Sequence, residues 1–133
     1  MDENQITKLP LNFRQEIKAL HKAGITSWEK LNDLEEKDLT NLIKNSNATP
    51  LNLKKLTGMA SLICEINISQ EEAALLIHSG LATSKALSEL NPQELLNKTA
   101  RLLRKLSPEI QPSLDLIKAR LWIHKAKQRQ ILN

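Results

Sequence analysis

The sequence predicts an all-α protein, folded as a compact bundle of about eight helices, some of them short. Apolar residues recur at helical spacing, and no segment alternates polar and apolar residues over the length of a strand. Hydroxyl and carboxamide residues stand before prolines or three residues before glutamates, which is typical of helix N-termini. In addition, two stretches 56 positions apart are nearly alike, and an internal repeat indicates one supersecondary unit built twice.

The repeat aligns residues 19–39 with residues 75–95. Gly24 aligns with Gly80, and the acidic positions of the first stretch align with acidic residues in the second. The leucine pairs are Leu20/Leu76, Leu31/Leu87, Leu34/Leu90 and Leu39/Leu95. We therefore expect repeat one at about 9–66 and repeat two at about 67–130, together forming a single helical domain at 9–130 after a flexible N-terminus at 1–8.

The helices expected in repeat one span residues 11–23, 27–33, 36–45 and 50–65. The first is predicted from a run of apolar residues at helical spacing. It ends at Gly24, because glycine adopts the left-handed conformation of a helix C-terminus at little cost. The second begins with a capping box from Thr26 to Glu29. The fourth begins at Pro50, because proline fits the first helical position and Thr49 can cap it.

The helices expected in repeat two span residues 70–79, 84–89, 92–106 and 112–130. Ser69 and Glu72 form a capping box for the first of them, and Gly80 ends it. Asn91 caps the third ahead of Pro92. Ser107-Pro108 through Pro112 forms a connector with two prolines that cannot be continuous helix, so we expect the last helix to begin at Pro112.

Composition limits the class of protein. The chain has 133 residues and no apolar run approaching the roughly 20 needed to span a bilayer. Its acidic, polar start differs from a secretory signal. Cys64 is the only cysteine, which leaves no disulfide framework and no cysteine-based zinc site. We expect a cytoplasmic protein without a membrane span, with Cys64 in the core beside Leu62, Ile63 and Ile66.

Positive charge is concentrated late in the chain. From Lys98 onward there are nine basic and two acidic residues, a net charge of +7, whereas the first 97 residues carry −3. The nine are candidate contacts for a partner or a nucleic acid: Lys98, Arg101, Arg104, Lys105, Lys118, Arg120, Lys125, Lys127 and Arg129. The alternative is that they form only a solvated face of two helices.

The last helix is apolar on two sides. One face contains Leu116, Ala119, Trp122, Ile123 and Ala126, and the other contains Leu114, Ile117 and Leu121. A helix of this kind is usually packed on both sides, so we expect it to run through the middle of the bundle. The alternative is that one face meets a protein partner or a second copy of the chain, as in a homodimer.

We find no catalytic, cofactor-binding or metal-binding constellation. His21, His78 and His124 lack partners at the spacing of metal ligands, and no phosphate-binding glycine loop or nucleophile motif occurs. We expect Trp122 in the core, while Trp28 could be core or a binding anchor. Gly24 and Gly80 are assigned structural roles in turns.

The runs Ala60–Ile63, Ala73–Leu76, Gly80–Thr83, Leu87–Leu95 and Trp122–Lys127 resemble a bacterial domain family of unknown function built from tandem helix-hairpin-helix repeats. The resemblance covers roughly residues 9–128 and implies an all-helical fold without catalytic activity. Helix-hairpin-helix domains commonly bind duplex DNA through a Gly-apolar-Gly hairpin that lets the backbone approach a phosphate.

The hairpin glycines are absent from this chain. Repeat two has Asn67-Ile68-Ser69, followed by Glu71 and Glu72, which place negative charge where a phosphate would lie. Repeat one has no glycine between Leu9 and Arg14. We therefore expect a non-enzymatic adaptor that recognises a protein partner through its helical surface. The alternative function is binding of DNA or RNA backbone, independent of sequence, through the basic C-terminal third.

Overall fold

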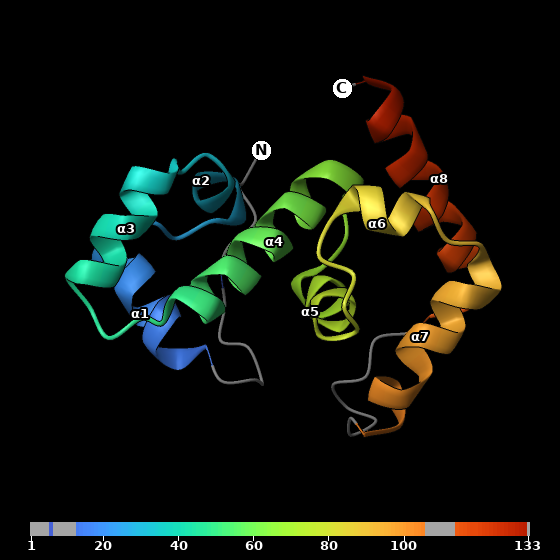
Figure 1. The fold of residues 1–133 in the computed structure, drawn as a ribbon, viewed down its shortest axis with the longest axis horizontal. Helices are drawn as coiled ribbons and strands as arrows, with labels where there is room; N and C mark the ends of the chain where they lie inside the picture. The colour runs from blue at the N-terminus through green and yellow to red at the C-terminus, as the bar shows by residue number, and fades with distance from the viewer. Residues whose placement is uncertain (1–5, 7–12, 106–113, 133) are drawn as a thin grey trace. The chain divides into compact units, whose positions relative to one another are not determined.

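The computed structural model describes Ile6 and residues 13–105 and 114–132, and these residues form eight α-helices and no strand (Figure 1). The helices are α1 (Arg14–Lys22), α2 (Trp28–Asn32), α3 (Glu36–Lys44), α4 (Pro50–Ile66), α5 (Gln70–His78), α6 (Ser84–Ser88), α7 (Pro92–Lys105) and α8 (Leu116–Leu132). The prediction of an all-α fold is therefore confirmed. The expected start of the first helix at residue 11, the connector from Ser107 to Pro112 and most of the N-terminal segment 1–8 lie outside the described residues.

Three predicted helix starts have the expected hydrogen bonds. Ser69 Oγ accepts from the amide of Glu72, whose carboxylate accepts from the Ser69 amide, and this completes a capping box. Asn91 and Glu94 make the same reciprocal pair at 2.8 and 3.0 Å ahead of Pro92. Thr49 Oγ1 accepts from the amide of Asn52 at 3.2 Å. These contacts satisfy amides that a first helical turn otherwise leaves unpaired.

Two predicted helix starts are wrong. The cap of α2 is Ser27, whose Oγ accepts from the amide of Lys30, so the start lies one residue later than the box expected from Thr26. The last helix does not begin at Pro112, because Leu114 and Asp115 are not helical. Asp115 caps α8 instead, with its carboxylate 2.8 Å from the amide of Lys118.

Both turn glycines adopt the left-handed conformation, with φ of 83° at Gly24 and 87° at Gly80. The residue after each glycine donates its amide to a leucine carbonyl in the last turn of the helix, from Ile25 to Leu20 at 2.8 Å and from Leu81 to Leu76 at 2.9 Å. This bond is typical of the Schellman motif, which ends a helix while pairing its last carbonyls.

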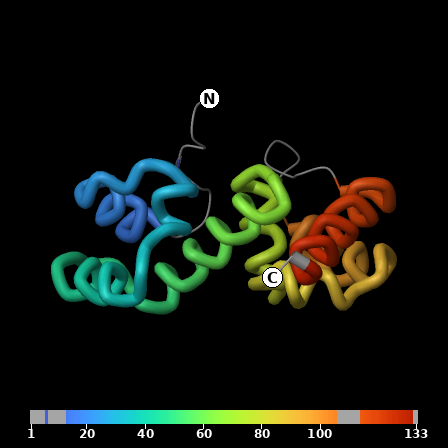
Figure 2. Tube along the Cα trace, turned by 90° about the horizontal axis from the view of Figure 1, so that it is seen from above, coloured from blue at the N-terminus to red at the C-terminus, as the bar shows by residue number. Residues whose placement is uncertain are grey.

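The chain divides into two compact units, Met1–Ala60 (unit 1) and Ser61–Asn133 (unit 2), with the boundary inside α4. The core of unit 1 contains Phe13, Leu20, Trp28, Leu31, Leu53 and Leu56. The core of unit 2 contains Ile66, Leu75, Leu76, Leu87, Leu95 and Trp122. Within unit 2, α8 packs on α6 and α7, and α7 packs on α5 (Figure 2).

The order and spacing of the helices in unit 1 recur in unit 2. Helices α5, α6 and α7 each begin 56 residues after α1, α2 and α3. The last helices of the two units match at an offset of 63, where both members of each pair are buried. These pairs are Leu56/Ala119, Met59/Trp122, Ala60/Ile123 and Ile63/Ala126. Connector length therefore differs between the units, while these four pairs keep their register. Leu53, Leu62 and Ile66 of α4 are also buried, but the matching residues Leu116, Lys125 and Arg129 are not.

Cys64 does not lie in the core. Its side chain is exposed, whereas Leu62, Ile63 and Ile66 of the same helix are buried. The expectation of a core cysteine is therefore wrong. Successive helical residues turn by about 100°, so Leu62, Ile63 and Ile66 fall on one side of α4 and Cys64 falls on the other. Trp28 and Trp122, in contrast, are both buried.

Candidate binding surface on α7 and α8

Helix α8 buries one of its two apolar faces except at Leu116, the first residue of that face, which is 43% exposed. Ala119, Trp122, Ile123 and Ala126 are at most 4% exposed, on the side that packs against α6 and α7. The expected core position of Trp122 is confirmed. Because these residues recur at spacings of three and four, they form one continuous stripe along the helix.

The second apolar face of α8 is exposed. Ile117 is 76% exposed, Leu121 48% and Ile131 83%, and we call these three residues the outer row. At 100° per residue they fall within one sector of the helix surface, opposite Ala119 and Ala126. The expectation that α8 runs through the middle of the bundle is therefore wrong. Beyond α8, Leu51 is the one large hydrophobic side chain among the described residues that is similarly exposed.

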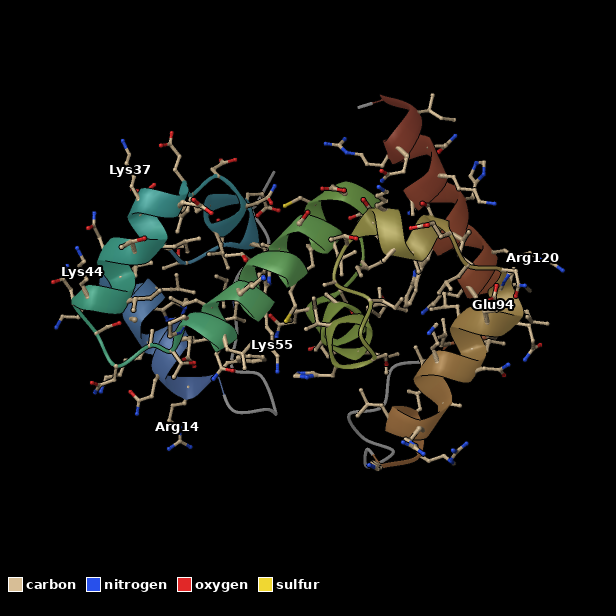
Figure 3. The ribbon with its side chains drawn as sticks, viewed as in Figure 1. Arg14, Lys37, Lys44, Lys55, Glu94 and Arg120 are labelled. Carbon is tan, nitrogen blue, oxygen red and sulfur yellow. The ribbon has the colours of Figure 1, made fainter. Side chains whose placement is uncertain are left out.

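Cationic side chains flank the outer row on both sides. Arg120 and Lys127 are exposed on one flank, Arg129 is exposed on the other, and α8 contains no acidic residue. Arg120 points away from the helix into solvent (Figure 3). The same sector of the helix also carries the exposed polar side chains His124 and Gln128 between Leu121 and Ile131, so the outer row is apolar at Ile117 and Leu121 and again at Ile131.

The two remaining lysines of α8 are engaged inside unit 2. Lys118 Nζ donates to Glu72 Oε2 at 2.8 Å, and Lys125 Nζ donates to the carbonyl oxygen of Ile66 at 3.3 Å. These partners stand on either side of the turn Asn67-Ile68-Ser69, in which Asn67 has a φ of 55°. Lys118 and Lys125 of α8 therefore hold this turn in place.

A third contact holds the C-terminal part of α8. Gln130 Nε2 donates to Ser84 Oγ at 3.1 Å, and Ser84 Oγ in turn donates to Glu65 Oε1 at 2.5 Å. Glu65 also accepts from Ser61 Oγ at 2.7 Å. With Lys118 and Lys125, this network attaches α8 along its length, so the outer row is presented by a well-anchored helix.

The ion pair to Lys118 changes the titration of Glu72. Burial raises the pKa of Glu72, but the hydrogen bond from Lys118, the hydrogen bonds with Ser69 and the positive charge of Lys118 together outweigh it. The pKa of Glu72 therefore lies below its ordinary value of 4.5. A carboxyl with a lowered pKa stabilises the fold above its unfolded pKa, and this stabilisation is lost as pH falls through the folded pKa.

We accordingly expect Glu72→Gln to destabilise the protein near neutral pH and to change its stability much less in acid. The measurement is the free energy of unfolding by urea for both proteins between about pH 7 and about pH 3. Glu71→Gln, at the exposed neighbouring position, is the control and should show a small difference at every pH. A Glu72→Gln effect that does not depend on pH would contradict a stabilising ion pair.

Helix α7 carries the other four predicted contacts. Lys98, Arg101, Arg104 and Lys105 are all exposed, and none of them forms an ion pair with a described residue. Arg101 and Arg104 lie opposite the buried side chains Leu95 and Thr99, whereas Lys98 and Lys105 lie to one side of them. Seven of the nine basic residues are thus exposed on α7 and α8, whereas Lys118 and Lys125 are used to hold the fold.

Unit 1 contains a groove that the sequence did not predict. It encloses about 510 Å³ between α1 and α3, within the range of roughly 300–1,000 Å³ that is usual for binding pockets. Its apolar lining comes from Ala19, Ala23, Ile25, Leu34 and Leu42. The available signal was the pair of alanines at positions 19 and 23, where the aligned positions of repeat two are Leu75 and Ser79.

The described part of the chain contains no group of three or more histidine, cysteine, aspartate or glutamate residues placed to hold a metal ion. In the same part of the chain, no helix combines the length and the apolar character needed to cross a membrane.

The model of one protein family matches residues 10–129, and its description is "Domain of unknown function (DUF4332)". No curated protein and no solved structure matches the chain. Since the match covers all but the two ends of the sequence, this chain belongs to the DUF4332 family of domains of unknown function.

Proposed function

We propose that this protein is a non-enzymatic adaptor that binds a protein partner through the outer row of α8. One observation carries the proposal: Ile117, Leu121 and Ile131 are exposed on a helix whose opposite face is buried and whose polar surface carries only positive charge. Exposed apolar side chains gathered on one helix face are a typical feature of surfaces that bind other proteins. The cytoplasmic location expected from the single cysteine is part of this proposal.

The chemistry of the outer row defines the partner. Ile117 and Leu121 are one helical turn apart, so they can enter adjacent positions of an apolar groove, as amphipathic helices do in many complexes. Arg120, Lys127 and Arg129 favour acidic residues at the edges of that groove, since complementary charge accelerates encounter and selects partners. The partner surface is thus apolar at its centre and acidic at its rim.

Binding of DNA or RNA backbone is a second candidate, favoured by the four exposed cations of α7. Lys98, Arg101 and Lys105 recur at spacings of three and four on one face, where they could follow a phosphate backbone. In the tandem helix-hairpin-helix interpretation, phosphate binding would use the turn Asn67-Ile68-Ser69. Here Glu72 pairs with Lys118 beside that turn, which supports a structural role for the turn and leaves α7 as the nucleic-acid surface.

Affinity capture from native cell extract tests the two candidates together. We expect the wild-type protein to retain a partner protein in stoichiometric amount. The double substitution Ile117→Ser/Leu121→Ser should reduce the captured amount of this partner at least about tenfold. Leu51→Ser is the matched control, because Leu51 is a similarly exposed apolar residue outside α8. Lys98→Glu/Arg101→Glu should leave this capture intact.

A different outcome would favour the second candidate. If nucleic acid alone were recovered, and Lys98→Glu/Arg101→Glu abolished its recovery, the adaptor proposal would be overturned. Binding to the phosphate backbone would also weaken steeply with salt, because each cation that pairs with a phosphate releases a counterion.

A further inference from the structure

The groove between α1 and α3, which we call the α1–α3 groove, is formed by unit 1 alone and has an apolar lining. Ala19 lines it on α1, whereas the aligned Leu75 is 2% exposed and belongs to the core of unit 2. No side chain of α3 is buried, although the aligned helix α7 buries Leu95 and Thr99. Unit 1 therefore leaves an apolar surface uncovered where unit 2 has buried side chains.

The α1–α3 groove has no net charge. Its lining contains one basic and one acidic residue, Lys22 and Asp38. The two lysines of α3, Lys37 and Lys44, are not part of the lining and extend into solvent (Figure 3). Because complementary charge is what selects charged partners, a groove of this composition favours an uncharged ligand.

Two carboxamides supply free hydrogen-bonding groups to the groove. Asn41 and Asn45 lie one turn apart on α3 and line the groove, and neither side chain forms a hydrogen bond with another described residue. Ser46 and Asp38, in contrast, bond to nearby main-chain atoms. Since a carboxamide both donates and accepts, each asparagine is able to pair with the N–H and the C=O group of a peptide main chain.

The spacing of the two asparagines matches an extended peptide. Because an α-helix rises about 1.5 Å per residue, Asn41 and Asn45 are offset by about 6 Å along α3. An extended chain rises about 3.3 Å per residue and presents the same edge at every second residue, which is a repeat of about 6.6 Å. Alternate residues of such a peptide therefore reach Asn41 and Asn45 in turn, while alternate side chains face the apolar lining.

The pair of free carboxamides is present in unit 1 only. Asn97 of α7 aligns with Asn41, but its Oδ1 accepts from Gln93 Nε2 at 3.1 Å and is thus already used. Arg101 stands at the position that aligns with Asn45. Unit 2 is consequently an internal control for the groove of unit 1.

We propose that the α1–α3 groove binds an extended, uncharged peptide segment of a protein partner. Asn41 and Asn45 each donate to a main-chain carbonyl and accept from a main-chain N–H, and alternate apolar side chains of the peptide contact Ala23 and Leu42. A helical segment does not satisfy these carboxamides, because its main-chain groups are paired with one another. The inference goes beyond the proposed function, since it gives the adaptor a second binding surface with a different selectivity from that of α8.

Selection of short random peptides displayed on phage, with the full chain as the immobilised protein, tests the inference. The library is first depleted on Ala23→Leu, in which a larger side chain enters the groove at an exposed position. We expect the peptides then retained by the wild type to be uncharged with apolar residues at alternate positions, and their affinity to change little with salt. No enrichment, or enrichment of charged peptides or of apolar residues at helical spacing, overturns the inference.

A synthetic copy of a selected peptide locates the contacts on the protein. Asn41→Ala/Asn45→Ala should weaken its binding about tenfold or more, because hydrogen bonds to both carboxamides are lost. Asn97→Ala removes the aligned carboxamide of unit 2 and should leave binding unchanged. These positions are exposed on helices, so the folds should survive, which circular dichroism checks. Equal binding by Asn41→Ala/Asn45→Ala and the wild type overturns the inference.

Methylation of the main-chain nitrogens of the peptide, one at a time, tests the extended conformation on the unaltered protein. Each methyl group removes one N–H donor, so binding should fall most at alternate residues, those whose edge faces α3. A uniform loss along the peptide, or no loss at any position, contradicts recognition of the main chain by Asn41 and Asn45.

The outer row provides an independent reference. Ile117→Ser/Leu121→Ser should bind the selected peptide as the wild type does, because the groove is formed by unit 1 alone. If these substitutions abolished peptide binding, the groove would not be the site. Capture of a partner through α8 is measured with the same variant, so the groove and the adaptor function proposed for α8 can fail separately.

Discussion

Replacement of Trp122 by alanine is expected to lower the free energy of unfolding by about 3–5 kcal/mol, the usual cost of removing a large aromatic side chain from a core. Trp122 is 3% exposed and lies at the centre of the stripe by which α8 packs on α6 and α7. The indole cannot be replaced by neighbouring atoms without leaving a cavity, and cavities forfeit both burial and dispersion contacts.

The adjacent residue is the control for this experiment. Leu121 belongs to the outer row, so Leu121→Ala removes a side chain that is already 48% exposed and should cost well under half as much. Urea unfolding followed by circular dichroism measures both variants. Similar losses at positions 121 and 122 would contradict the orientation of α8 on which the proposed function depends.

A second large effect is expected at Glu16, a carboxylate that is only 1% exposed. It accepts from the amide of Thr49 at 2.8 Å and from Asn52 Nδ2 at 3.4 Å, and so ties α1 to the start of α4. Glu16→Ala would remove the acceptor from both donors. We expect a loss of about 1–3 kcal/mol, because polar groups that stay partly buried lose their partner without regaining full hydration.

Two comparisons make the measurement specific to the hydrogen bonds. Glu16→Gln keeps an acceptor oxygen for the Thr49 amide and should be less destabilising than Glu16→Ala. Gln15→Ala, at the exposed neighbouring position of α1, should change the stability little. Equal losses for Glu16→Gln and Glu16→Ala would show that the carboxylate acts through its charge and not through these two bonds.

Glu16 and Glu72 are 56 residues apart and serve the same purpose in the two units. Each links the first helix of its unit to the beginning of the last one, through Thr49 in unit 1 and through Lys118 in unit 2. The sequence showed both carboxylates but not their partners. Their partners lie 33 and 46 positions away in the chain, and only folding brings them within hydrogen-bond distance.

The predictions that were confirmed depend on interactions within a few residues. A capping box needs only Ser69 and Glu72, and a Schellman turn needs only Gly80 and the helix before it, so the order of residues is sufficient to locate them. The errors at Thr26 and Pro112 have the same local character. In each case a residue nearby, Ser27 or Asp115, caps the helix instead.

The residues of the candidate binding surface depend instead on how whole helices pack together. Helical periodicity showed that α8 has two apolar faces, but the face covered by α6 and α7 could be identified only from the packed structure. The same holds for the exposed Cys64 and for the α1–α3 groove. Helix order, caps and turns follow from local backbone chemistry. Exposure depends on the helices that pack alongside, so tertiary structure alone distinguishes the core of α8 from the outer row that we propose as its binding face.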